Sequence, residues 1–203
     1  MPSARGCWRP CNRDLPPLPE FVETVNASLR TLGRVRDLCL FRAGPQDLPY
    51  SPRAVIALLI AGAVLETFWD FHQGGGIAMV IAANLGALAA LGALHAMLRW
   101  RGAPERFVQT ALALLSTGLL FEVLVLPLLL YVGHPLKPEQ VSGTQLLAAF
   151  VVFVLLLWQM GISVRILRSA LRIPVPGALL ALFALGFVDV IAAVLFAAAF
   201  GAA

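Results

Sequence analysis

The chain has 203 residues, of which 60% are apolar and only 13% are charged, and its formal net charge is +4. A soluble domain is about half apolar and about a quarter charged, so this composition excludes an ordinary soluble protein. The apolar residues fall in long uninterrupted blocks, and the basic residues gather at the ends of these blocks and near the amino terminus. This distribution is typical of membrane topology signals and not of a nucleic-acid-binding face, so no nucleic-acid partner is expected.

The amino-terminal region divides into two parts. Residues 1–19 are polar and rich in proline, which predicts a disordered cytoplasmic tail. Residues 20–42 place apolar side chains on one helical face and mostly polar ones on the other, which predicts an amphipathic interfacial helix on the cytoplasmic leaflet. Its basic residues Arg30, Arg34 and Arg36 would then contact lipid or a partner. In the competing interpretation, the helix is a docking surface for a partner protein.

A proline-rich segment, residues 43–52, cannot continue this helix and turns the chain into the membrane. The remainder, residues 53–203, is predicted to be a transmembrane domain of five helices. Each is close to the ~20 residues needed to cross the hydrocarbon core. The predicted spans are 53–71, 77–98, 107–132, 144–167 and 176–200. The fold class is therefore an all-α integral membrane protein, a five-helix bundle preceded by an interfacial helix.

Loop charge predicts the orientation. The segment before the first span, the connection between spans two and three, and the connection between spans four and five all carry several arginines, whereas the opposite loops carry only Lys137. By the positive-inside rule the arginine-rich side faces the cytoplasm. We therefore expect the amino terminus inside and the carboxyl terminus outside.

Motifs for catalysis are missing from the sequence. There is no nucleophile-base pattern, no His-Glu-x-x-His motif and no phosphate-binding loop, so we expect no catalytic residue and no enzyme. Cys7 and Cys11 have no second pair or histidine nearby to complete a zinc site. No metal site and no cofactor are expected. Trp158 and Gln159, in the fourth span, are interpreted as helix packing.

Polar side chains inside the spans are the strongest functional candidates, because their burial in a membrane is costly. Counting ~1.5 Å per residue places Glu66, Asn84, Glu122 and Asp189 at one level, about 20 Å from the cytoplasmic boundary, with no Lys or Arg at that depth. Two interpretations stay open. The acids converge to hold a cation or pass a proton, or each is a protonated structural group that hydrogen-bonds a neighbouring helix.

The layout resembles Yip1-type membrane proteins. The run Asp-Leu-Pro-Tyr-Ser-Pro from Asp47 to Pro52 is similar to the Asp-Leu-Tyr-Gly-Pro segment of eukaryotic members but departs from it at its centre. Five spans, Trp158 in the fourth and the basic stretch from Arg165 to Arg172 are also similar. The resemblance implies vesicle trafficking with small GTPases for eukaryotic relatives, while prokaryotic members lack an assigned role.

The Ala-, Leu- and Arg-rich, nearly lysine-free composition is typical of a GC-rich bacterium, so we expect a plasma (inner) membrane protein without a trafficking role. The predicted function is a non-enzymatic scaffold or accessory factor for other membrane components, with the lipid bilayer and other membrane proteins as partners. The alternative is a small transporter or ion- or proton-conducting protein. That alternative requires Glu66, Glu122 and Asp189 to line a shared polar cavity.

Overall fold

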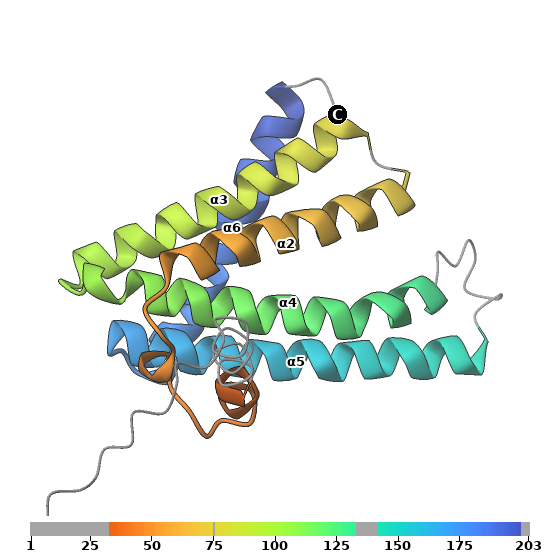
Figure 1. Cartoon of the computed structure of the whole chain (residues 1–203). Coiled ribbons are helices and arrows are strands. Elements are labelled where there is room, and N and C mark those ends of the chain that lie inside the picture. The colour runs from red at the N-terminus through yellow and green to blue at the C-terminus, as the bar shows by residue number, and fades with distance from the viewer. Residues whose placement is uncertain (1–32, 75, 133–141, 200–203) are drawn as a thin grey trace, which may run out of the picture.

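The computed structural model describes residues 33–74, 76–132 and 142–199, and no strand occurs within these ranges. Five helices in them are long and apolar enough to cross a membrane, so the prediction of a multi-span helical membrane protein is confirmed. These helices (Figure 1) are α2 (Pro52–His72), α3 (Ile77–Trp100), α4 (Phe107–Val132), α5 (Gly143–Leu171) and α6 (Val175–Ala199).

The expected amphipathic helix is described only at its carboxyl-terminal end, where residues 33–39 are helical. Residues 20–32 lie outside the described part of the chain, as does the predicted tail 1–19. The helix as a whole therefore stays a prediction. Two short 3₁₀ turns complete the regular structure, η1 (Pro45–Asp47) and η2 (Pro104–Arg106).

Local sequence explains where the helices begin. Ser51 is the N-cap of α2, where its Oγ accepts a hydrogen bond from the Ala54 N–H at 3.3 Å, and Pro52 follows at the first helical position. Ser142 caps α5 in the same way and forms a reciprocal capping box with Gln145. These contacts satisfy N–H groups that have no partner within the helix.

Helix α5 continues beyond its predicted end at residue 167. It ends at Leu171, followed by Arg172 in the left-handed conformation (φ 52°) as C-cap. Arg165 and Arg168 therefore belong to the last turns of the helix and not to a loop. Positive side chains stabilise a helix carboxyl terminus, and Pro174 prevents further extension, which explains the longer helix.

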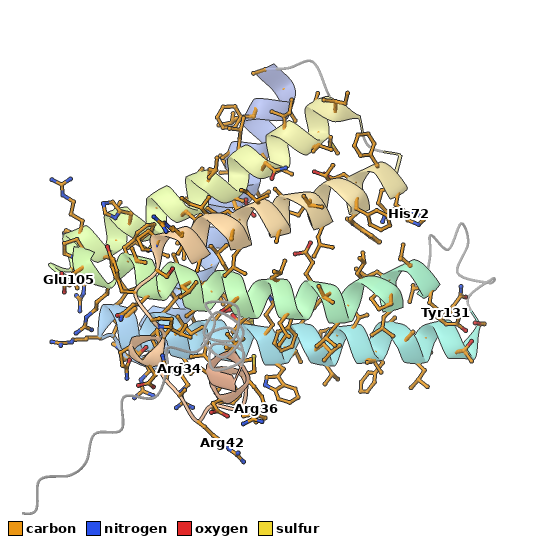
Figure 2. All side chains as sticks on the ribbon, viewed as in Figure 1. Arg34, Arg36, Arg42, His72, Glu105 and Tyr131 are labelled. Atoms are coloured by element: carbon orange, nitrogen blue, oxygen red, sulfur yellow. The ribbon has the colours of Figure 1, made fainter. Side chains whose placement is uncertain are left out.

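The helices pack mainly in pairs. Helix α3 has its largest contact with α6, α4 lies along α5, and α2 packs on α4. In Figure 1, α4 and α5 run side by side while α6 crosses behind α2 and α3. In Figure 2, Arg34, Arg36 and Arg42 lie below α5, between its middle and the end of the bundle that carries Glu105. Glu105 marks one end of the bundle, and His72 and Tyr131 mark the other (Figure 2). We call the first the arginine-rich end.

Close packing of α3 on α6 depends on a glycine. A Cβ added at Gly86 would lie 2.6 Å from the backbone oxygen of Asp189 and 3.1 Å from the Cβ of Ala193. Ala82, one turn earlier on α3, is also buried. Small residues at this spacing let the two backbones approach each other without lipid between them.

The fully buried side chains lie mostly near the arginine-rich end. Leu98 and Leu167 are 0% exposed and form one cluster with residues of α3, α5 and α6. A second cluster joins α4 and α5 to the segment that precedes α2. Much of the remaining apolar surface is exposed on the outside of the helices, as a bundle surrounded by lipid requires.

The segment before α2 packs against the side of α5, between its middle and the arginine-rich end. Leu38 and Leu48 are buried together with Ile162 of α5. The Trp158 Nε1–H donates a hydrogen bond to the Cys39 carbonyl at 3.1 Å. At residues 33–39 the apolar face therefore covers protein.

Candidate functional site

We call the four polar residues predicted at one level, Glu66, Asn84, Glu122 and Asp189, the carboxylate layer. Three of them line one cavity. Glu66 of α2, Asn84 of α3 and Glu122 of α4 all face a space of about 610 Å³ between α2, α3, α4 and α5. Gln159 of α5 also lines it. The rest of its wall is apolar and comes from leucines and small residues of these helices, with Phe121 of α4. The helix order therefore brings together Glu66, Asn84 and Glu122, for which the sequence had indicated only a common depth.

A smaller cavity of about 250 Å³ adjoins the first. Glu66 and Glu122 line both cavities, and Trp69 and Asp70 are added from the last turns of α2. Asp70 follows Glu66 by four residues, so both carboxyl groups share one face of the helix. The second cavity thus extends the acidic lining from the middle of the bundle toward the His72 end of α2.

Asp189 occupies a different position. It lies on α6, on the far side of α3, where one of its carboxyl oxygens would be 2.7 Å from a Cβ added at Gly86. It is not among the residues that line either cavity. The expectation of a shared cavity therefore holds for Glu66 and Glu122 but not for Asp189.

The carboxyl groups of the layer have few polar partners. Asn84 Nδ2 donates to the Val80 carbonyl of its own helix at 2.8 Å. Within the described part of the chain, no side-chain or backbone N–H or O–H donates to the carboxyl groups of Glu66, Glu122 or Asp189. The Asp70 Oδ2 atom is buried and also has no partner there. The interpretation in which each acid hydrogen-bonds a neighbouring helix thus has no such bond among the described residues.

The lining also contains no positive group. Lys, Arg and His are missing from the described walls of both cavities. Glu66 and Glu122 border the same two cavities. Like charges in a low-dielectric bundle cannot all be ionised without a cation nearby, so the arrangement can accept either protons or a positively charged ligand.

The described side chains do not form a binding site for a metal ion. Across residues 33–74, 76–132 and 142–199, no group of three or more His, Cys, Asp or Glu side chains lies close enough to hold a metal ion. The carboxyl groups surround a space of small-molecule size instead, because pockets for such ligands are typically ~300–1,000 Å³.

The main cavity opens on the surface of the bundle. Leu88 and Leu156 belong to its wall and are 54% and 49% exposed. In a membrane this opening faces the acyl chains, so a ligand with an apolar part could reach the carboxyl groups from the bilayer.

Two residues of this site were missed from the sequence. Asp70 is not among the residues that the sequence analysis names, although its spacing of four residues from Glu66 indicates the same helical face. Gln159 was assigned to packing but lines the main cavity. Its neighbour Trp158 fits the packing interpretation, since its ring lies edge-on to Phe121 with a centroid distance of 6.5 Å.

The basic residues predicted to contact lipid or a partner lie only partly within the described chain. Arg34 and Arg36 are exposed near the arginine-rich end, and Arg36 forms an ion pair with Asp37 at 3.2 Å. Arg30 lies outside the described residues. Their exposure is compatible with lipid or partner contact, which stays a prediction.

No family model, curated protein or solved structure matches this chain.

Proposed function

We propose that this protein is a small membrane transporter that binds a hydrophobic organic cation in the cavity between α2, α3, α4 and α5. The observation that supports the proposal best is the meeting of Glu66 and Glu122, from two different helices, in one cavity whose remaining walls are largely apolar. Intramembrane carboxyl groups that face a shared cavity commonly belong to a substrate or ion pathway.

The chemistry of the walls favours this ligand class. Negative side chains without a positive counterpart favour a cation, and the leucine-rich wall favours an apolar body attached to it. A cavity of about 610 Å³ is larger than a single metal ion requires. The lateral opening beside Leu88 supports access from the lipid.

The second cavity supports a route for protons or for the cation. Asp70 and Glu66 follow each other along one face of α2, toward the end of the helix at His72. Because Glu66 borders both cavities, a ligand in the main cavity and protons arriving along the second would compete for the same carboxyl group. Such competition is the simplest coupling between a cation and a proton.

Equilibrium binding of radiolabelled tetraphenylphosphonium to the purified full chain in neutral detergent tests the proposal. Glu66→Gln and Glu122→Gln keep size and hydrogen bonding but remove the charge, and each should raise the Kd about tenfold or more, which corresponds to ~1.4 kcal/mol. Glu105→Gln makes the same change on the exposed turn η2 and should leave binding unchanged.

An uncharged aromatic compound provides the ligand control. Triphenylphosphine oxide, which has three of the same rings and no charge, should bind much more weakly than tetraphenylphosphonium. Equal affinity for both compounds, or equal affinity of the Glu→Gln variants and the parent, would overturn the cation site. It would leave the scaffold or accessory role as the better account of the protein.

We also propose that the arginine-rich end faces the cytoplasm of a bacterium, with the chain in the plasma (inner) membrane. The loop charges support the orientation, and the Ala-, Leu- and Arg-rich, nearly lysine-free composition supports the bacterial source. A reporter active only in the cytoplasm should give signal when fused after Arg101 or Arg172 and none after Gly74 or Ala203. Signal at Ala203 would contradict the proposed orientation.

A further inference from the structure

Helix α5 presents a row of basic side chains at its carboxyl-terminal end. Arg165, Arg168, Ser169 and Arg172 follow the three- and four-residue spacing that puts side chains on one helical face, and with Ile173 they line a cavity of about 410 Å³. The guanidinium groups of α5 therefore gather around one space at the arginine-rich end.

A second cavity, of about 260 Å³, adjoins this one and shares Arg165 and Ser169 with it. Its opposite wall comes from the segment that precedes α2 and includes Arg42 and Asp47. The Arg165 guanidinium donates a hydrogen bond to the Phe41 carbonyl and lies 5.5 Å from the centroid of the Phe41 ring. These two contacts hold Arg165 in place between the two cavities.

Other arginines at the same end are engaged in structural contacts. Arg101 Nε donates to the Leu171 carbonyl at 3.3 Å, and Arg106 Nη1 donates to the Ser169 carbonyl at 3.4 Å. Both side chains satisfy carbonyl groups at the end of α5 that have no partner within the helix. The helix terminus thus does not depend on Arg168 and Arg172 for capping by side chains.

Three of the four arginines that line the two cavities are not engaged in such contacts with the described residues. Within the described part of the chain, the side chains of Arg42, Arg168 and Arg172 donate no hydrogen bond and form no ion pair. The single acid in the lining is Asp47, whose Oδ2 accepts a hydrogen bond from the Gly44 N–H at 2.7 Å. One engaged carboxylate among four guanidinium groups leaves the adjoining cavities strongly positive.

We propose that these two adjoining cavities bind the phosphate group of an anionic phospholipid. Guanidinium groups bind phosphate oxygens through paired, charge-assisted hydrogen bonds, and Arg42, Arg168 and Arg172 have donors free for this. The cavities lie at the ends of spans, where headgroups are found, and Trp100 at the end of α3 is 88% exposed as an interfacial tryptophan would be. A soluble phosphate ester carries the same group, and the test separates the two sources.

The site is distinct from the cation cavity, since the two have no residue in common. Its role would be to fix the depth and tilt of α5, and to join the segment before α2 to the membrane surface through Arg42. Neither role depends on the proposed transport activity.

Thermal stability of the purified full chain in neutral detergent, with increasing phosphatidylglycerol, tests the proposal. The parent should be stabilised, because a ligand that binds only the folded state raises its melting temperature. In the double variant Arg168→Gln/Arg172→Gln, half-maximal stabilisation should need about tenfold more lipid or more, because the charge-assisted hydrogen bonds of two guanidinium groups to the phosphate are lost.

Three controls make the result decisive. Arg53→Gln/Arg99→Gln removes two exposed charges near the same end and should shift the lipid requirement by less than about twofold. Arg168→Lys/Arg172→Lys keeps the charge, so it should retain part of the response and serves as the test if the Gln variant does not fold. Phosphatidylcholine should stabilise the parent far less than phosphatidylglycerol.

An equal loss in both Gln double variants would overturn the proposal, because the lipid would then respond to total charge and not to this site. An equal response to phosphatidylcholine would overturn it as well. A full response to glycerol 3-phosphate at the same concentration would overturn the assignment to lipid and identify a soluble phosphate ester as the ligand.

Discussion

Polar side chains at the arginine-rich end and in the carboxylate layer differ in their hydrogen bonding. At the arginine-rich end, Arg101 and Arg106 donate to carbonyl groups of α5. In the layer, the carboxyl groups of Glu66 and Glu122 receive no hydrogen bond from the described residues and face open cavities.

This difference in hydrogen bonding indicates that the arginine-rich end stabilises the fold, whereas the carboxylate layer is available to a ligand. A buried polar group without a partner costs free energy, so proteins keep such groups mainly where a ligand, water or proton supplies the partner. The close-packed leucine cluster near the arginine-rich end can offset that cost. The layer can then be open without loss of the fold.

Core truncation should give the largest contrast between the two regions. Leu98 is 0% exposed in the cluster near the arginine-rich end, and Leu98→Ala should destabilise the protein by about 2–5 kcal/mol. Leu88, on the same helix, lines the open cavity and is 54% exposed, so Leu88→Ala should change stability by less than about 0.5 kcal/mol. Unfolding in mixed detergent micelles measures both. Similar losses for the two variants would remove the distinction between packed end and open layer.

A smaller loss of stability is expected for a substitution where α3 packs against α6. Gly86→Ala would force its new methyl group against the Asp189 backbone and should cost about 1–3 kcal/mol. Gly92→Ala, on the same helix, meets nothing within 4 Å and should be neutral or stabilising by up to about 1 kcal/mol. The same unfolding measurement compares them. If Gly86→Ala were as stable as Gly92→Ala, the close contact that positions Asp189 would not exist.

The smallest expected effect is on how often the segment before α2 detaches from the bundle. Trp158→Phe removes the hydrogen bond to the Cys39 carbonyl, worth about 1 kcal/mol, so the segment should detach about fivefold more often. Maleimide labelling of Cys39, in a chain with Cys7→Ser and Cys11→Ser, should accelerate accordingly. Burial raises the pKa of the Cys39 thiol, so labelling of the parent should be slow at neutral pH and faster at higher pH, where the thiolate forms.

Trp100→Phe is the matched control, because Trp100 is 88% exposed at the end of α3. Its labelling rate should equal that of the parent. Equal rates for Trp158→Phe and Trp100→Phe would mean that this hydrogen bond does not hold the segment.

The spans could be predicted from the sequence because each is a long apolar block bounded by arginine, glycine or proline. The level of Glu66, Asn84 and Glu122 followed from counting helical rise. Their meeting could not be predicted, because the order of helices depends on packing such as that of Gly86 against α6. For the same reason Asp189, at the same level, is separated from the cavity by α3.

Chemical labelling of Glu66 and Glu122 shows whether a cation occupies the cavity that these residues line. Dicyclohexylcarbodiimide reacts with protonated carboxyl groups in apolar surroundings, and mass spectrometry of the native full chain identifies the residues modified. We expect Glu66 or Glu122 to be modified. Tetraphenylphosphonium should slow this modification about tenfold or more, and triphenylphosphine oxide at equal concentration should leave its rate unchanged. Modification that proceeds at the same rate with and without the cation would contradict a cation site in this cavity.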